Sequence, residues 1–266
     1  MAIRRLVIGP GAMAYFGFLG ALSALNDKGA LNELEAVSGS SAGGLLGFMY
    51  ILAKGDTKRI FDFSLKVPIK KLMKPNIKTL LKSFGLVSTK KLYNYFQETV
   101  SEFIPGQTDI TFKELYDHWN IKFYIPSCCL NLYTTHYFSV DHSPDMSVLR
   151  AICMTIAVPF LIESVEYNNL RYIDGSVLET TPCSPFIGQE NVQVVCVDDW
   201  SLETIVPDLK TYAVGIINSA MGLRHKYPQF PCTTVSIPAD IMFDFGSSTE
   251  SKVKLFTSGY MSARIY

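Results

Sequence analysis

The sequence predicts an α/β protein built on a parallel sheet with covering helices. Short apolar stretches alternate with longer helical ones, and glycine-rich turns join them. A later stretch, Val192–Val197, is almost entirely apolar, as expected for a parallel strand that is buried on both faces. The chain has 266 residues, of which 48% are hydrophobic and 18% are charged. This length and composition suit one packed domain of that class.

The N-terminal stretch allows two interpretations. Residues 6–25 carry no charge and follow two arginines, a composition that is also typical of a signal peptide or a membrane anchor. However, a Gly-Pro-Gly sequence at residues 9–11 interrupts the stretch, and an isolated spanning helix tolerates such a break poorly. We therefore predict a strand at Arg5–Ile8, a tight turn, and a buried helix at Ala12–Leu25.

The rest of the chain continues the alternation. We predict strands at Leu34–Val37, Lys122–Leu130, Thr134–Val140 and Thr233–Ile237, a hairpin of Glu163–Tyr167 with Arg171–Ile173, and helices at about 39–54, 146–158, 209–221 and 250–264. Residues 56–119 combine helical patterning with many lysines and several helix-breaking prolines. We expect a single domain over residues 1–266, with a helical, lysine-rich insertion or lid at about 56–119.

Composition argues against several function classes. The formal net charge is zero, so the whole chain carries no charge signal for nucleic acid. None of the six cysteines forms a CxxC pair or a Cys/His cluster with zinc-ligand spacing. The Asp198-Asp199 pair supplies too few carboxylates for a calcium site. We therefore expect reduced structural thiols, a cytoplasmic location, no metal and no cofactor.

The strongest chemical motif is a G-x-S-x-G sequence. It runs from Gly39 to Gly43 with Ser41 at its centre, after a short apolar strand and before an apolar helix. Small residues two positions before and after the serine permit the sharp strand-to-helix turn that exposes a nucleophilic hydroxyl. The motif alone is equally compatible with an ordinary Gly/Ser-rich turn.

A second glycine-rich turn, Gly9-Pro10-Gly11-Ala12, follows the first strand. Backbone N–H groups at such a turn can bind a phosphate or the oxyanion of a tetrahedral intermediate. The turn is not a dinucleotide fingerprint, because Ala14 stands where the third glycine belongs, and no GK[ST] follows it. Pro10 has no N–H, so Gly11 and Ala12 are better donor candidates than the proline. A simple tight turn remains the alternative.

Asp174, followed by Gly175, ends a predicted strand late in the chain. A carboxylate there can orient and deprotonate a serine. A Ser–Asp–His triad would also fit the chain order, but Ser41 comes too early for the usual hydrolase fold. The histidines, moreover, lie in polar or loop-like surroundings: His118, His136, His142 and His225. A Ser41–Asp174 dyad is therefore the better hypothesis.

Together these motifs resemble the patatin-like phospholipases. The glycine-rich turn, the G-x-S-x-G and the late D-G occur in the family's order. The segment 148–160, with Ala157 and Pro159, resembles the family's helix and A-x-P turn, and Thr181-Pro182 resembles its N-x-P segment. The resemblance implies a three-layer α/β/α fold related to the catalytic domain of cytosolic phospholipase A2.

The resemblance also implies roles for the residues. Ser41 would be the nucleophile, Asp174 the base, and the turn of Gly9, Gly11 and Ala12 the oxyanion hole. The substrate would be a phospholipid or another acyl lipid. This sequence departs from the family pattern, because Pro10 replaces a glycine and Met13 stands about where a basic residue belongs. Two alternatives therefore stay open, a catalytically weak lipid-binding protein and an acyltransferase on the same scaffold.

The predicted insertion suggests a lipid-facing surface. No acidic residue occurs between Asp62 and Glu98, but eight lysines do, interleaved with apolar residues. Such a face could rest on anionic headgroups as a peripheral membrane contact, with Lys70, Lys71 and Lys74 as the candidate contacts. The alternative is a solvated helical face whose lysine stems cover apolar surface.

Overall fold

The chain folds around a mixed sheet. The computed structural model describes residues 2–198, 215 and 230–264, so most of the helix predicted at 209–221 lies outside the described residues. The strands are β1 Arg5–Ile8, β2 Ala36–Gly39, β3 Gly85–Val87, β4 Lys122–Cys129, β5 Thr134–Phe138, β6 Phe160–Ile162, β7 Val165–Tyr167, β8 Leu170–Asp174, β9 Val192–Val197 and β10 Cys232–Val235. In the described part they form a sheet of order β10-β9-β1-β2-β4-β8-β7, with β5 on β4, and a separate β3-β6 pair.

One half of the large sheet is parallel and the other antiparallel. Strand β1 pairs in parallel with β2 and with β9, β2 pairs in parallel with β4, and β9 with β10. Beyond β4, the strands β5, β8 and β7 pair antiparallel. The carboxyl ends of β1 and β2 therefore lie side by side, and β8 runs antiparallel to β4. This arrangement confirms the α/β class that the sequence predicts.

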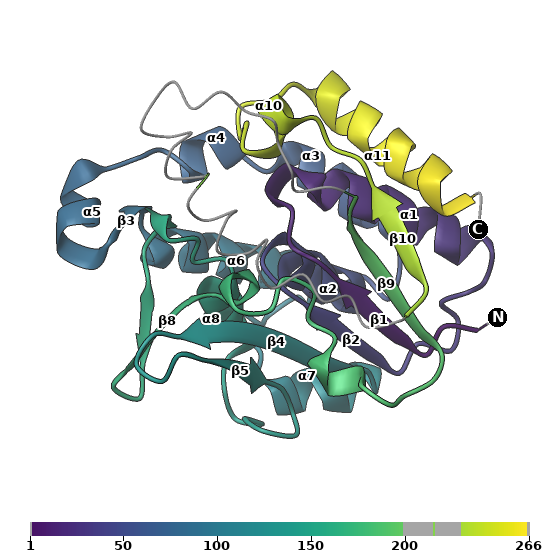
Figure 1. Ribbon diagram of the computed structural model, residues 1–266, viewed down its shortest axis with the longest axis horizontal. Helices are drawn as coiled ribbons and strands as arrows, with labels where there is room; N and C mark the ends of the chain where they lie inside the picture. Colours follow the sequence, from purple (N-terminus) through teal and green to yellow (C-terminus); the bar gives the residue numbers. More distant parts are fainter. Residues whose placement is uncertain (1, 199–214, 216–229, 265–266) are drawn as a thin grey trace.

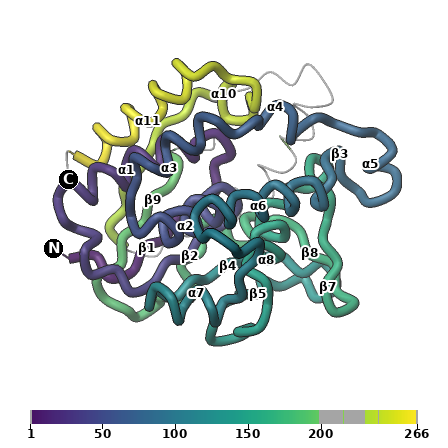
Figure 2. Tube along the Cα trace, turned by 180° about the vertical axis from the view of Figure 1, so that it is seen from behind, coloured from purple at the N-terminus to yellow at the C-terminus, as the bar shows by residue number. Residues whose placement is uncertain are grey.

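Helices cover one face of the sheet, and the short helix at residues 77–83 stands out from the body, as Figures 1 and 2 show. The helices are α1 Tyr15–Asp27, α2 Ala42–Leu52, α3 Thr57–Lys66, α4 Ile69–Leu72, α5 Ile77–Ser83, α6 Thr89–Phe103, α7 Phe112–Trp119, α8 Val148–Thr155, α10 Ala239–Met242 and α11 Thr249–Arg264. Three short 3-10 helices join them, η1 Ala12–Ala14, η2 Gly175–Val177 and η3 Ser184–Phe186. The segment that carries η3 packs against the other face.

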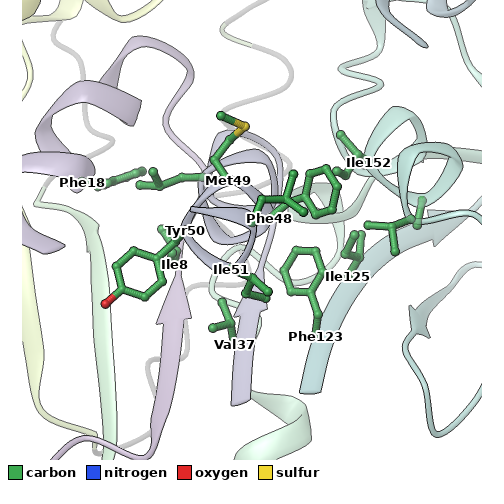
Figure 3. Close-up of a cluster of buried hydrophobic side chains, with 14 of the residues drawn as sticks. Ile8, Phe18, Val37, Phe48, Met49, Tyr50, Ile51, Phe123, Ile125 and Ile152 are labelled. Carbon is green, nitrogen blue, oxygen red and sulfur yellow. The ribbon is translucent and has the colours of Figure 1, made fainter. Parts of the chain in front are cut away.

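The core lies between the sheet and the helical layer. Successive residues of a strand point to opposite faces, so Leu6 and Ile8 join the main core while Val7 packs against Phe186 on the other face. Figure 3 shows the centre of the main core, where side chains of α1, α2 and α8 meet those of the strands. The rings of Phe48 and Phe123 stack there at a centroid distance of 6.4 Å. This packing fixes the start of α2 above the sheet.

The N-terminal stretch folds as the strand–turn–helix interpretation predicts. Strand β1 matches the predicted range, and α1 follows after the short η1. Nine residues of α1 are buried, so its lack of charge reflects its place in the core. Among the described residues, no helix combines the length and the hydrophobicity needed to cross a bilayer.

The segment 56–119 differs from its prediction. It contains α3 to α7, but it also contains β3, which pairs in parallel with β6. Both strands have only three residues, and a three-residue strand shows no period that a sequence pattern can detect. Gly85 explains the pairing, because a Cβ there would lie 2.2 Å from the backbone nitrogen of Glu163. Glycine thus lets the two segments approach.

Candidate active site

Ser41 lies on a sharp turn between β2 and α2. Its backbone has φ 55° and ψ −125°, outside the ordinary regions for a non-glycine residue. Such a conformation costs of order 1–3 kcal/mol and persists only where the surroundings enforce it, most often at functional sites. The residue is 8% exposed and borders an apolar cavity. This is the geometry of a nucleophile on a strand-to-helix elbow.

The two glycines of the motif are required by close packing. A Cβ on Gly39 would lie 2.5 Å from the carbonyl oxygen of Gly43. A Cβ on Gly43 would lie 2.3 Å from the carbonyl oxygen of Ile8. Real Cβ atoms do not approach backbone atoms so closely. The motif therefore allows the start of α2 to rest directly on the ends of β1 and β2.

Asp174 stands at the end of β8 and is almost completely buried, at 1% exposure. The N–H and hydroxyl groups of Ser176 both donate to its Oδ1, at 2.9 and 2.7 Å. Its Oδ2 is buried and makes no hydrogen bond of normal geometry within the described residues. One carboxylate oxygen is thus held by its own turn, and the other is left available. Gly175 lets this turn form, because a Cβ there would lie 2.4 Å from the carbonyl oxygen of Pro126.

Burial raises the pKa of Asp174 from its usual 3.8 to about 6. Removing water from around the carboxylate disfavours its charged form, and this effect outweighs all others. Hydrogen bonds from Ser176, and the approach of the Ser41 side chain, lower the pKa in part. The Ser41 hydroxyl is therefore near the carboxyl group, although no hydrogen bond of normal geometry joins them; such contacts are often long before substrate binds. A carboxylate with this pKa suits general-base work near neutral pH.

The end of α8 connects both residues of the predicted dyad. The backbone N–H of Ser41 donates to Thr155 Oγ1 at 3.1 Å. The N–H of Asp174 donates to the carbonyl oxygen of Ala157 at 3.0 Å. Sequence analysis singled out neither Thr155 nor Ser176. A signal existed only for Ser176, because an aspartate that accepts from the N–H two residues on is a common turn.

The glycine-rich turn offers fewer donors than its sequence suggests. The N–H of Gly9 donates to Val195 O at 2.9 Å, as part of the β1–β9 pairing, and so it is committed to the sheet. Ala12 has φ 46°, a strained value for a non-glycine residue, and it borders the same cavity as Ser41. Gly11 and Ala12 remain as candidate donors. A third is Ala42, which sequence analysis did not consider; as the first residue of α2, its N–H has no acceptor within the helix.

The cavity beside Ser41 is apolar and measures about 190 Å³. It is bordered by η1 and α1, by α2, by helices of the segment 57–103, and by residues 156–162. Leu45 and Met49 come from α2, whereas Leu72 and Phe96 come from α4 and α6. Among the described residues, no charged side chain borders it. An alkyl chain fits such surroundings.

Other candidate residues lie elsewhere. Among the described histidines, none borders the cavity: His118 bonds to a backbone carbonyl of its own helix, and His136 to the Tyr172 hydroxyl at 3.0 Å. His225 lies outside the described residues. Lys70, Lys71 and Lys74 are exposed and do not border the cavity. Within the described ranges, no group of three or more possible metal ligands occurs.

Fold and site together define an α/β protein with a serine nucleophile elbow, a buried aspartate and an apolar cavity. The chain belongs to the patatin-like phospholipase family, whose pattern matches residues 6–187. The match includes both Ser41 and Asp174. It confirms the family and the fold that the motifs imply.

Two viral proteins are similar to the chain. The probable lipid hydrolase 463L of invertebrate iridescent virus 6 is 24% identical over 269 residues, which cover 98% of this chain and 88% of that protein. The uncharacterized protein R571 of Acanthamoeba polyphaga mimivirus is 26% identical over 191 residues, which cover 69% of this chain and 61% of that protein.

Two solved structures share the fold. VipD of Legionella pneumophila superposes with a TM-score of 0.65 at 14% identity, and the type III effector ExoU with 0.55 at 15%. The matches cover 99% and 98% of this chain. In the other direction, the chain spans 66% of VipD and 52% of ExoU. At these identities the likeness concerns the fold alone.

Proposed function

We propose that the chain is a lipid acyl hydrolase, a phospholipase A or esterase, that works through a Ser41–Asp174 dyad. One observation carries the proposal: a strained serine borders an apolar cavity, and its side chain lies near a buried aspartate with a pKa of about 6. Membership of the patatin-like phospholipase family and similarity to a probable lipid hydrolase support the substrate class. No cofactor or metal takes part in the proposed reaction.

The reaction proceeds through an acyl-enzyme. The Ser41 oxygen attacks the ester carbonyl carbon while its proton passes to Asp174. The bond to the alcohol oxygen then breaks, and the leaving alcohol or lysolipid takes that proton. Water next attacks the acyl carbon and gives a proton to Asp174. The fatty acid leaves, and the Ser41 oxygen regains its proton.

Two other parts of the site assist these steps. The N–H groups of Gly11, Ala12 and Ala42 stabilise the oxyanion, each worth about 3 kcal/mol of barrier by analogy with known oxyanion donors. The apolar cavity holds the acyl chain, so that the ester carbonyl reaches Ser41 with its headgroup outside. Because the substrate is a lipid, we expect the chain to act peripherally at a membrane.

A weaker enzyme that mainly binds lipid is the second candidate. It is favoured by the turn at residues 9–12, where Pro10 has no N–H and the N–H of Gly9 is engaged by Val195. An acyltransferase would share the same acyl-enzyme and differ only in its acceptor. Product analysis with and without an added alcohol separates transfer from hydrolysis.

The dyad is tested by labelling with a fluorophosphonate probe and by hydrolysis of a short-chain nitrophenyl ester. We expect the wild type to label and turn over, and folded Ser41→Ala and Asp174→Ala variants to do neither. Thr57→Ala, a buried change at the start of α3 where the hydroxyl donates to Ser23 Oγ, serves as the folding control. A folded wild type that neither labels nor hydrolyses would make the lipid-binding candidate the better one.

A further inference from the structure

A cluster of apolar side chains points into solvent at one end of the molecule. Figures 1 and 2 both show α5 and β3 standing out from the body, far from α11. Ile77, Leu81 and Phe84 are 68, 80 and 58% exposed, and Phe160 is 55% exposed. We propose that this apolar tip, made of Ile77, Leu81, Phe84 and Phe160, inserts into the interface of an anionic membrane.

The tip is built as an outward-facing stripe. Ile77, Leu81 and Phe84 are spaced i, i+4 and i+7, so they share one face of α5 and its C-cap. A soluble helix usually turns such a stripe to the core, but α5 buries no residue of its own. Phe160 joins the stripe through β6, where it pairs with Gly85. This pairing places Phe160 opposite the residue that follows Phe84, so the exposed apolar residues gather at one end of α5.

Positive charge surrounds the tip. Lys74, Lys78 and Lys82 are exposed on or beside α5, and the Arg171 guanidinium lies 5.3 Å from the Phe84 ring. The nearby acids are already engaged: Glu166 pairs with Arg171, and Glu163 accepts from the N–H and hydroxyl of Thr89. Apolar residues ringed by cations are the pattern that anionic interfaces attract. Charge complementarity thus selects an anionic lipid surface as the occupant.

The chain segments that carry the tip also border the cavity beside Ser41. Leu72 and Met73, just before α5, border the cavity, and so do Leu161 and Ile162, just after Phe160. Insertion of the tip would therefore bring the cavity close to the lipid layer. This last step rests on the proposed function, whereas membrane binding itself does not.

Membrane binding is measured by co-sedimentation of the Ser41→Ala chain with phosphatidylcholine vesicles, with and without phosphatidylserine. The test variants are Ile77→Gln with Leu81→Gln, and separately Phe84→Asn, which keeps a residue that tolerates the φ of 67° at that position. The matched control changes two exposed helical positions on α11, Val253→Gln with Met261→Gln. We expect each tip variant to bind the anionic vesicles at least about tenfold more weakly, because apolar burial is lost. The control should bind normally.

Two further measurements separate the possible outcomes. Leu81→Trp should shift its fluorescence to the blue when anionic vesicles are added, which adsorption by charge alone would not cause. When Ser41 is left unchanged, the tip variants should hydrolyse a soluble short-chain ester at the wild-type rate. If the wild type does not hydrolyse the ester, the proposed function is contradicted, whereas the proposed membrane insertion of the tip is not. Tip variants that bind vesicles normally, or that lose only self-association in light scattering, would overturn the insertion.

Discussion

At the scale of single residues, Asp174 combines a cost in stability with a gain in reactivity. Its carboxyl group is buried and accepts hydrogen bonds from Ser176 of its own turn, and burial raises its pKa to about 6. Ser41 and Ala12 add strained backbone at φ 55° and 46°. Such features are costly to keep in a fold and concentrate where chemistry needs them.

The raised pKa predicts how pH acts on stability. The folded chain holds the Asp174 proton more tightly than the unfolded chain, so the free energy of unfolding falls as pH rises from about 4 to about 6. Above that window the ionised group costs the fold about 3 kcal/mol. Asp174→Asn should therefore increase the free energy of unfolding at pH 7 by about 1–3 kcal/mol, and so raise the Tm. The same change should abolish hydrolysis.

Unfolding followed by circular dichroism at pH 4, 6 and 8 measures this difference. The gain should shrink at pH 4, where the wild-type carboxyl is already protonated. Over the same range, kcat/KM of the wild type should rise with pH through about 6, as the base ionises. An Asn variant that is less stable than the wild type at pH 7 would contradict the assigned burial cost.

At the scale of secondary-structure elements, the end of α8 and the cavity walls determine the site. Thr155 and Ala157 accept hydrogen bonds from the backbones of Ser41 and Asp174, so a single turn sets the relative position of the two catalytic candidates. The cavity, in contrast, takes much of its wall from α3, α4 and α6. These helices belong to the segment 57–103, which contributes no strand to the large sheet.

Substitution in one of these helices should change acyl-chain preference. Leu72 on α4 is half-buried and borders the cavity. Leu72→Trp should therefore fill part of the cavity, whose volume is about 190 Å³. We expect kcat/KM for a long-chain nitrophenyl ester to fall about tenfold relative to a butyrate ester, because the displaced chain loses about 1–2 kcal/mol of apolar burial. Met261→Trp, on the exposed side of α11, is the control. An unchanged chain-length ratio would remove this cavity from the acyl-binding role.

At the scale of the whole molecule, positive and negative charges are equal in number but unevenly distributed along the chain. The net charge is zero, but the stretch between Asp62 and Glu98 contains lysines and no acid. Among them Lys70, Lys71 and Lys74 are exposed. The Lys91 ammonium, by comparison, bonds to backbone carbonyls of Lys71 and Leu72. A surface of this kind adsorbs to anionic lipid in a salt-dependent way.

Charge reversal tests that surface. Changing Lys70, Lys71 and Lys74 to Glu should weaken binding to phosphatidylserine vesicles at least about tenfold, since each nearby lysine contributes about 1 kcal/mol. The effect should fade as salt rises and screening shortens the reach of the charges. Lys58, Lys113 and Lys254 changed to Glu give the same net charge elsewhere on the surface. If both triple variants bind equally, or activity on micelles is unaffected, the lysines only solvate their helices.

Much of the fold follows from the sequence because the signals are local. The Gly39–Gly43 motif between an apolar strand and an apolar helix predicts the elbow, since the turn needs small residues at fixed positions. Local apolar patterning likewise predicts β1, β9 and α11 closely. The order of the motifs indicates the family, and the match over residues 6–187 bears that out.

Only the tertiary structure decides which groups meet. Thr155 lies 114 residues from Ser41, and no spacing predicts its hydrogen bond. The N–H of Gly9 donates to Val195 of β9, which is far from it in sequence, so the turn has fewer free donors than its glycines suggest. The stripe on α5 resembles a core-facing pattern but faces solvent. Local patterns encode conformation, whereas contact, burial and the pKa of Asp174 arise from segments that only folding brings together.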